Sequence, residues 1–291
     1  MDIFLLLEQS RVFLLIAAGA FGLAVGSFLN VVIHRLPVMM ERHWRRECAE
    51  LAGDVTAIDE QPYNLVIPAS CCPHCGHRIR IHENIPLLSY LLLKGRCAGC
   101  GAAISPRYPL VEMTTALLSV ITVAQFGYSM QALAALLFTW TLVPLFMIDF
   151  DHQLLPDSIT LPLLWAGLLL SPAQVFVDPV TSITGAAAGY LSLWSIYHLF
   201  RLVTGKEGMG YGDFKLLGAI GAWVGWQALP VVILFSSVVG AAIGIGLIIF
   251  KGRDHNQPMP FGPFLAAAGW LTLLWGTPIT EAILQGSFIP G

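Results

Sequence analysis

The stretch "GMGYGDFKLLGAIGAW", residues 208–223, places three glycines and the acid Asp213 directly before an apolar run. A carboxylate at the edge of a membrane is costly, and glycines weaken a helix. Neither residue type helps a plain spanning helix to form. An ionisable side chain in such a position therefore indicates a functional site.

The composition around this stretch is typical of a membrane protein. Of the 291 residues, 56% are hydrophobic and only 11% are charged, whereas soluble domains carry about 25% charged residues. A helix needs roughly 20 apolar residues to cross a bilayer. We therefore expect an all-α polytopic membrane protein with about eight transmembrane helices, over residues 12–33, 108–127, 130–148, 159–176, 181–203, 214–226, 229–250 and 261–284.

The basic residues lie almost entirely on one side of this helix map. Fourteen of the fifteen Lys and Arg side chains lie in or beside the loops 34–107, 149–158, 201–213 and 251–260, and only Arg11 lies on the other side. The positive-inside rule predicts that these four loops are cytoplasmic and that both termini face outward. We expect contacts with membrane lipid and none with nucleic acid.

The longest loop carries two cysteine pairs and is the only soluble region of any size. "CPHCG" (72–76) and "CAGCG" (97–101) each end in a glycine that suits a tight turn. Two Cys-x-x-Cys pairs at this spacing indicate a tetrahedral Zn²⁺ site. Four thiolates fill the coordination sphere, so we expect the metal to organise the loop without catalysing hydrolysis. The predicted ligands are Cys72, Cys75, Cys97 and Cys100.

Other arrangements of these cysteines stay open at this point. A pair of disulfides is the competing interpretation, which a reducing cytosol disfavours. Cys71 adjoins the first pair and competes with Cys72, while His74 and His77 are alternative ligands. Cys48 is interpreted as a bystander thiol.

Two aspartates from distant parts of the chain reach the same cytoplasmic edge. Asp149 follows the apolar residues 130–148, and Asp213 begins the sixth helix. If the two carboxyl groups meet, one of them stays protonated, because two close carboxylates do not both ionise readily. The ionised group can then activate water as a general base while the acid donates to the scissile carbonyl. Such a pair hydrolyses peptides without a covalent intermediate.

Plainer roles compete with catalysis at these positions. Asp213 is also suited to cap the sixth helix, and Asp157, which follows Pro156, is interpreted as the N-cap of the fourth. Asp151 is the closest rival of Asp149, but solvation is enough to explain it.

The glycines beside Asp213 favour the catalytic interpretation. Gly210 and Gly212 permit unusual backbone angles and a close approach by another chain. A peptide must be extended to be cleaved, and a glycine-lined loop next to an acid can accept it as an added strand.

Four motifs together resemble the type IV prepilin peptidase family, which are bacterial inner-membrane GxGD aspartyl proteases. The resemblance covers nearly the whole chain. By it, Asp149 and Asp213 match the two catalytic aspartates, and the four cysteines match a tetrad found in many members. The motifs are "GLAVGSFLNVVIHRLP" (22–37), the paired cysteines, "MIDFDHQLLPD" (147–157) and "GMGYGDFKLLGAIGAW" (208–223).

The resemblance implies two activities at the cytoplasmic face of the membrane. Members remove the short basic leader of type IV prepilins and of type II secretion pseudopilins, cleaving after a glycine at the edge of the substrate's hydrophobic helix. Many also methylate the new N-terminal residue with S-adenosylmethionine. Gly95, in "LLLKGRCAGCG" (91–101), is a candidate contributor to methyl transfer, although a turn into the second cysteine pair explains it equally well.

The resemblance also divides the chain into three parts. We expect a first transmembrane helix in 1–34, a cytoplasmic zinc-binding loop in 35–107 and a GxGD peptidase membrane domain in 108–291. The Pro/Gly helix entry "PMPFGPFLAAAG" (258–269) is interpreted as part of the rim of the site.

Two other functions compete with this interpretation. One is a GxGD protease that acts on other membrane substrates, and the other is an ion transporter with a zinc-bound regulatory loop. Transporters place their key acids near the bilayer midplane, often within inverted repeats. Asp149 and Asp213 are expected at the membrane edge, and the sequence shows no such repeat. The pattern favours the protease.

The charge map makes a direct prediction about topology. In an otherwise cysteine-free variant, a cysteine that replaces Ser129 should react with an impermeant thiol reagent added from the periplasmic side. A cysteine that replaces Ser158 should not react, because it lies in a cytoplasmic loop. The reverse labelling pattern would overturn the map and the cytoplasmic site.

Overall fold

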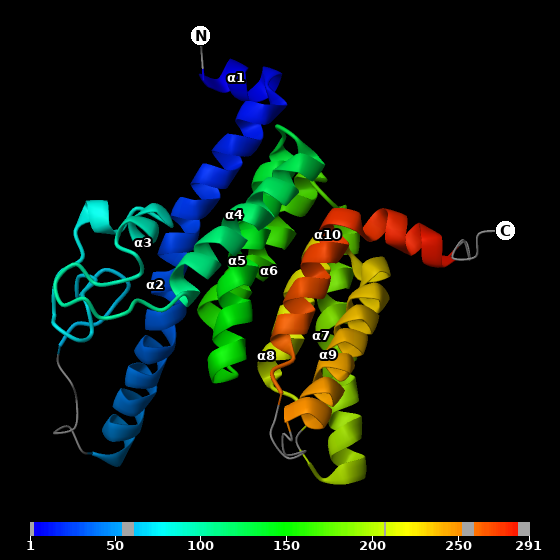
Figure 1. Ribbon diagram of the computed structural model, residues 1–291. Helices are drawn as coiled ribbons and strands as arrows, with labels where there is room; N and C mark the ends of the chain where they lie inside the picture. The colour runs from blue at the N-terminus through cyan, green and yellow to red at the C-terminus, as the bar shows by residue number, and fades with distance from the viewer. Residues whose placement is uncertain (1–2, 54–60, 207, 252–258, 285–291) are drawn as a thin grey trace. The chain divides into compact units, whose positions relative to one another are not determined.

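The computed structural model is helical throughout most of the chain that it describes, namely residues 3–53, 61–206, 208–251 and 259–284. These residues contain no β-strand, and only two isolated antiparallel bridges occur, in the cysteine loop. The expected all-α fold is confirmed. In chain order the helices are α1 Ile3–Gln9, α2 Arg11–Ala52, the 3₁₀ turn η2 Ile81–Glu83, α3 Leu88–Leu92, α4 Arg107–Phe126, α5 Met130–His152, α6 Asp157–Leu170, η3 Ser171–Ala173, α7 Pro179–Thr204, α8 Tyr211–Val224, η4 Trp226–Ala228, α9 Leu229–Lys251 and α10 Gly262–Leu284 (Figure 1).

The chain forms two compact units, Met1–Tyr128 and Ser129–Gly291. The first contains α1 to α4 with the cysteine loop, and the second contains α5 to α10. Each of the two predicted sites therefore lies within a single unit, the cysteines in the first and the aspartates in the second. The three-part division expected from the sequence stays a prediction.

Each of the eight apolar segments expected from the sequence corresponds to a helix. Among the described residues, four segments are long and apolar enough to cross a membrane: α2, α4, α5 and Trp226–Phe250. The apolar segments Asp157–Ala173 and Gly262–Gly276 are shorter. The chain is thus a multi-pass membrane protein, and the count of eight spans is approximate. Arg253 and most of the loop 251–260 lie outside the described residues.

The first long helix extends well beyond the end that the sequence suggested. We expected it to end at residue 33, but α2 continues through Pro37 to Ala52. A proline removes only its own N–H, and beyond it Glu41 and Arg45 form an i,i+4 ion pair at 2.6 Å that supports the helix. Gly53, in the left-handed region with φ 72°, ends it. At 1.5 Å per residue, the 42 residues span about 63 Å, twice the roughly 30 Å of a bilayer core.

Small residues allow α2 and α4 to pack closely in the first unit. A Cβ atom on Gly22 would lie 2.7 Å from the Ser119 hydroxyl, and one on Gly26 would lie 2.7 Å from the Glu112 Cα. Lipid supplies little hydrophobic driving force between helices, so such contacts depend on close backbone approach. This packing brings Glu112 of α4 against the middle of α2.

The second unit is built around α8, a helix too short to span a bilayer alone. Its 14 residues cover about 21 Å. Ten of them are buried, and the four that are not are Tyr211, Gly212, Lys215 and Val224. Gly185 and Gly189 of α7 face the backbone carbonyls of Gly221 and Leu217. Neighbouring helices thus surround α8 and replace lipid around it.

Candidate active site and metal centre

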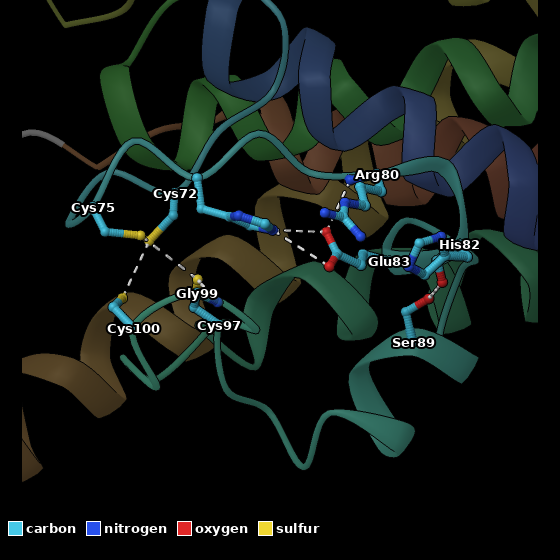
Figure 2. Close-up of polar contacts among 10 residues, drawn as sticks. Cys72, Cys75, Arg80, His82, Glu83, Ser89, Cys97, Gly99 and Cys100 are labelled. Carbon is cyan, nitrogen blue, oxygen red and sulfur yellow. Dashed lines mark hydrogen bonds and ion pairs between the residues drawn. The ribbon is translucent and has the colours of Figure 1, made fainter.

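Four cysteine thiols converge in the loop between α2 and α4 (Figure 2). All four Sγ atoms lie within 4.8 Å of one another. The Sγ atoms of Cys72 and Cys100 are 3.8 Å apart, and those of Cys75 and Cys97 are 4.0 Å apart. Four sulfurs bound to one tetrahedral zinc at about 2.3 Å stand about 3.8 Å from each other. The cluster therefore has the dimensions of a zinc site.

The two cysteine pairs share one backbone conformation. The amide of Cys72 donates to the His77 carbonyl at 2.9 Å, and the amide of Gly76 donates back to Cys72 at 2.9 Å. The second pair repeats this arrangement, with Gly101 donating to Cys97 at 2.9 Å. Gly76 and Gly101 have φ of 71° and 72°, which glycine adopts without strain. The predicted tight turns are confirmed.

The geometry separates Cys72 from its neighbour in sequence. Cys71 is exposed and is not a member of the four-thiol cluster, and neither is His74. The backbone N–H groups of His74 and Cys75 lower the pKa of the Cys72 thiol to about 7. A lower pKa favours the thiolate, which is the form that binds metal.

His77 is engaged elsewhere than in the cluster. Its Nε2 lies 3.1 Å from the Glu83 carboxylate, which also accepts the Arg80 amide at 2.9 Å (Figure 2). The Arg80 amide, and next the His77 ring, hold the pKa of Glu83 below its usual range. His77 therefore links the first cysteine pair to η2 rather than serving as a ligand.

The presence of glycine at position 95 is explained by local structure, without a bound ligand. Its φ is 67°, and a Cβ atom there would lie 2.9 Å from the Tyr90 hydroxyl. Its amide donates to the Tyr90 carbonyl at 2.8 Å, and its carbonyl accepts the Ile104 amide at 2.7 Å. The plain interpretation as a turn into the second cysteine pair accounts for these contacts, and a role in methyl transfer stays a prediction.

The second unit brings Asp149 and Asp213 to one end of its helices. Asp149 lies in the last turn of α5, and Asp213 lies in the first turn of α8. Their exposed fractions are only 5% and 6%. Two nearly inaccessible acids, 64 residues apart in sequence, thus lie at the same end of the unit.

Asp149 is held by the N-terminus of α10. The amide of Gly262 donates to Asp149 Oδ2 at 2.9 Å. A carboxylate in the last turn of a helix opposes the helix dipole, whereas the N-terminus of another helix favours it. A Cβ atom on Gly262 would lie 2.6 Å from the same oxygen. The close approach of α10 therefore requires glycine at this position.

Asp213 does not cap α8, contrary to the alternative raised by the sequence. The N-cap is Gly210, and Asp213 is the third residue of the helix. The Asp213 amide donates to the Gly210 carbonyl at 3.2 Å, while its buried Oδ1 has no hydrogen-bond partner among the described residues. A buried oxygen left without a partner is costly, so it points to a role other than capping.

The two glycines before Asp213 differ from expectation in their conformation. Gly210 has ordinary extended angles, φ −79° and ψ 149°, and Gly212 is helical, so neither uses the unusual backbone angles that glycine permits. The expected close approach occurs at Gly212, where a Cβ atom would lie 2.8 Å from the Leu155 Cβ. On Gly210 the nearest atom to a Cβ would be Asp213 Oδ2, at 3.8 Å. The space beside the Asp213 carboxyl is thus kept free of a side chain.

The other aspartates of this region have different roles. Asp157 was expected to cap α6, but the N-cap is Pro156 and no side chain caps the helix. Asp157 instead pairs with Lys215 of α8 at 2.7 Å, because the same helix end brings a lysine within reach. Asp151 is exposed at the C-terminal end of α5, as expected for a solvated side chain.

Comparisons with known proteins match both units. A family model described as "Bacterial Peptidase A24 N-terminal domain" matches residues 20–126, and one described as "Type IV leader peptidase family" matches residues 136–245. A prepilin leader peptidase/N-methyltransferase from Aeromonas hydrophila is 60% identical over 262 residues, which cover 90% of each chain. The chain belongs to the type IV leader peptidase family.

Further relatives agree with this assignment. Proteins of the same name from Pseudomonas aeruginosa and Pseudomonas putida are 56% and 50% identical to the chain. The first alignment covers 91% of each chain, and the second covers 98% of this chain and 99% of the relative. No solved structure matches the chain. The resemblance drawn from the sequence motifs is confirmed.

The residues that contact the two acids were not predicted from the sequence. "PMPFGPFLAAAG" was interpreted as a helix entry at the rim of the site, but nothing singled out Gly262 as the donor to Asp149. Leu155, which lies against both Gly212 and Gly262, was not considered either. A glycine enclosed by two bulky residues, as in Phe261-Gly262-Pro263, was the available signal.

Adjacent cysteines provide a sharp test of the metal site. Cys72→Ser should lower zinc in the purified protein to well below one ion per chain, because three thiolates and a hydroxyl hold the ion less tightly. Cys71→Ser should keep the wild-type zinc content, measured by elemental mass spectrometry, since Cys71 lies outside the cluster. Equal zinc loss in both variants, or in neither, would contradict the ligand set.

Proposed function

We propose that the chain removes the basic leaders of type IV prepilins and type II secretion pseudopilins, and then methylates the newly exposed N-terminal residue. Membership of the type IV leader peptidase family supports the first activity, and the names of the relatives support both. The observation that carries the proposal is the pair of buried acids at one end of the helices, where Leu155 lies against both Gly212 and Gly262.

Asp149 and Asp213 act as the catalytic pair. In the proposed pair the two carboxyl groups share a single proton, so one is ionised and the other is an acid. The ionised carboxylate removes a proton from the attacking water, while the acid donates a proton to the scissile carbonyl oxygen. The tetrahedral intermediate then collapses: the proton taken from water passes to the leaving amine as the C–N bond breaks, and a hydroxyl proton of the intermediate returns to the carboxylate that served as the acid.

Two helix N-termini favour the one negative charge that this pair carries. Asp213 lies in the first turn of α8, and Asp149 accepts the Gly262 amide at the start of α10. Partial positive charge at a helix N-terminus favours a nearby anion. The pair can therefore be buried and still hold the charged group that activates water.

Gly210 and Gly212 form the substrate loop in this proposal. The 3.8 Å between a Cβ atom on Gly210 and Asp213 Oδ2 leaves room for substrate backbone beside the acid. The extended conformation of Gly210 suits pairing with an extended peptide. Gly212 lets α8 approach Leu155 closely, which keeps the loop against the acids.

The metal and the methyl donor have different roles in the proposed function. Zn²⁺ held by Cys72, Cys75, Cys97 and Cys100 is structural, because four thiolates leave no open position for water. S-adenosylmethionine supplies the methyl group when it is bound. Gly95 shapes the turn into the second cysteine pair, and we propose it as a contributor to methyl transfer through that turn.

We place the active site at the cytoplasmic face of the bacterial inner membrane. The basic residues gather in the loops on the side of the two acids, in agreement with the positive-inside rule. A substrate with a basic leader and a hydrophobic helix would then have its leader in the cytoplasm and its scissile bond at the membrane edge.

The acids can be tested by substitutions that preserve size. Asp149→Asn and Asp213→Asn should each lower the rate of leader cleavage roughly a hundredfold or more, because either change removes a proton-transfer group. The double variant should cost little beyond either single variant, since residues that act as a unit are not additive. The measurement is the rate of leader loss from a purified prepilin in detergent.

The control lies two residues away from Asp149. Asp151→Asn changes an exposed carboxylate of the same helix and should retain most of the cleavage rate. All variants should still transfer labelled methyl groups to a pre-cleaved pilin, which shows that they are folded. Full cleavage by either Asn variant would refute the catalytic pair.

The donor to Asp149 can be tested separately. Gly262→Ala places a methyl group 2.6 Å from Asp149 Oδ2, so α10 must move and the hydrogen bond is lost. Losing a hydrogen bond to a charged group is worth about 1.5–3 kcal/mol, which predicts a tenfold or larger fall in cleavage rate. Gly246→Ala in α9 is the matched control, because no atom lies within 4 Å of that site. An unchanged rate for Gly262→Ala would show that the contact is dispensable.

A further inference from the structure

The segment between the two cysteine pairs reaches deep along the membrane helices of its own unit. The amide of Leu87 donates to the Glu112 carboxylate at 2.7 Å. Glu112 lies five residues inside α4, about 7 Å from the helix start at Arg107. Glu112 also faces Gly26 on α2. Gly26 precedes Arg35, the first basic residue after the apolar part of α2, by nine residues or about 13 Å. Leu87 therefore lies at the level of the apolar parts of both helices.

The short helix α3 follows Leu87 at this level and presents leucines outward. Leu88, Leu91 and Leu92 have exposed fractions of 50%, 62% and 72%. A contiguous apolar patch of this kind indicates an interaction site on a soluble surface and lipid contact on a membrane surface.

Most backbone amides of this segment donate to groups within the protein. Irregular backbone is tolerated at membrane depth only where its polar groups are paired internally. The turn at Leu87, with φ 58° and ψ −45°, is strained for a non-glycine residue, and its amide is bound by Glu112. The Ser89 hydroxyl accepts the Ile85 amide and donates to the His82 carbonyl. Internal carbonyls also accept the amides of Leu88, Ser89, Leu91, Leu93, Lys94, Gly95 and Arg96.

The charges around α3 match a phospholipid headgroup layer. Between Glu83 and Glu112 the sequence has no acidic residue, and its only charged side chains are Lys94, Arg96 and Arg107. Basic side chains that flank an apolar segment pair with lipid phosphates while the apolar residues enter the acyl region. Nearby Tyr108 is 45% exposed, in keeping with the aromatic residues that are frequent at this interface.

We propose that α3 is a membrane-embedded anchor of the zinc loop, with Leu88, Leu91 and Leu92 in the acyl-chain region of an anionic bilayer. Lys94 and Arg96 then lie at the phosphates, and Glu112 fixes the depth of the segment by holding the Leu87 amide. The zinc loop is thereby attached to the bilayer surface as well as to α2 and α4. This anchoring does not depend on the proposed peptidase activity.

Photocrosslinking to lipid tests the anchor in the full-length protein. Benzoylphenylalanine replaces Leu92 in one variant and Leu51 in another, and each protein is reconstituted into vesicles of phosphatidylethanolamine, phosphatidylglycerol and a radiolabelled phospholipid. Leu51 is the matched control because it is also an exposed leucine on a helix, with an exposed fraction of 90%. It lies on α2, about 24 Å beyond Arg35. After irradiation, the lipid adduct should be several-fold greater at position 92 than at position 51.

Two results would overturn the anchor. One is equal lipid labelling at the two positions, and the other is a crosslink from position 92 to another segment of the chain in place of lipid. Both variants should keep the wild-type melting temperature. If the Leu92 variant does not fold, the same substitution at Leu91 gives the same readout.

Discussion

The hydrogen bond from the Gly262 amide to Asp149 is the contact on which the acidic end of the second unit depends. Two carboxyl groups with exposed fractions of 5% and 6% lie there, and burying a charged group without a partner is unfavourable. The N-terminus of α10 supplies the hydrogen-bond donor to Asp149, and Asp213 lies in the first turn of α8. In the catalytic pair that we propose, both helices begin at this one level so that a single shared charge is tolerated. That requirement explains why an acid stands at the start of a hydrophobic segment.

Close packing by glycine makes this convergence possible. Gly212 and Gly262 both lie against Leu155, and a methyl group on either would collide with it or with Asp149. Further along α8, Gly221 meets Gly185 of α7 through backbone alone. Without such contacts a helix of 14 residues would expose polar ends to lipid. The glycines that weaken α8 as an isolated helix are those that let the rest of the unit enclose it.

Local patterns predicted the helices and the grouping of the four cysteines, because each follows from hydropathy or from short spacing. Contacts between distant segments were not predictable in the same way. Asp157 looked like a helix cap, and only the fold brings Lys215 within 2.7 Å of it. The end of α2 was missed because the expected span covered only the apolar run to residue 33, whereas the helix continues beyond Pro37 for 15 more residues.

The two units solve the same problem by different means, since each must hold polar groups at a membrane surface. The second unit pairs its acids with helix N-termini, whereas the first fixes its loop with four thiols, a buried glutamate and a nearly complete set of backbone hydrogen bonds. A metal bound by four thiolates has no vacant position at which to bind water. This is why we propose the carboxyl pair as the peptidase site, which leaves the cysteine loop a structural role or a role in the second, methyl-transferring reaction.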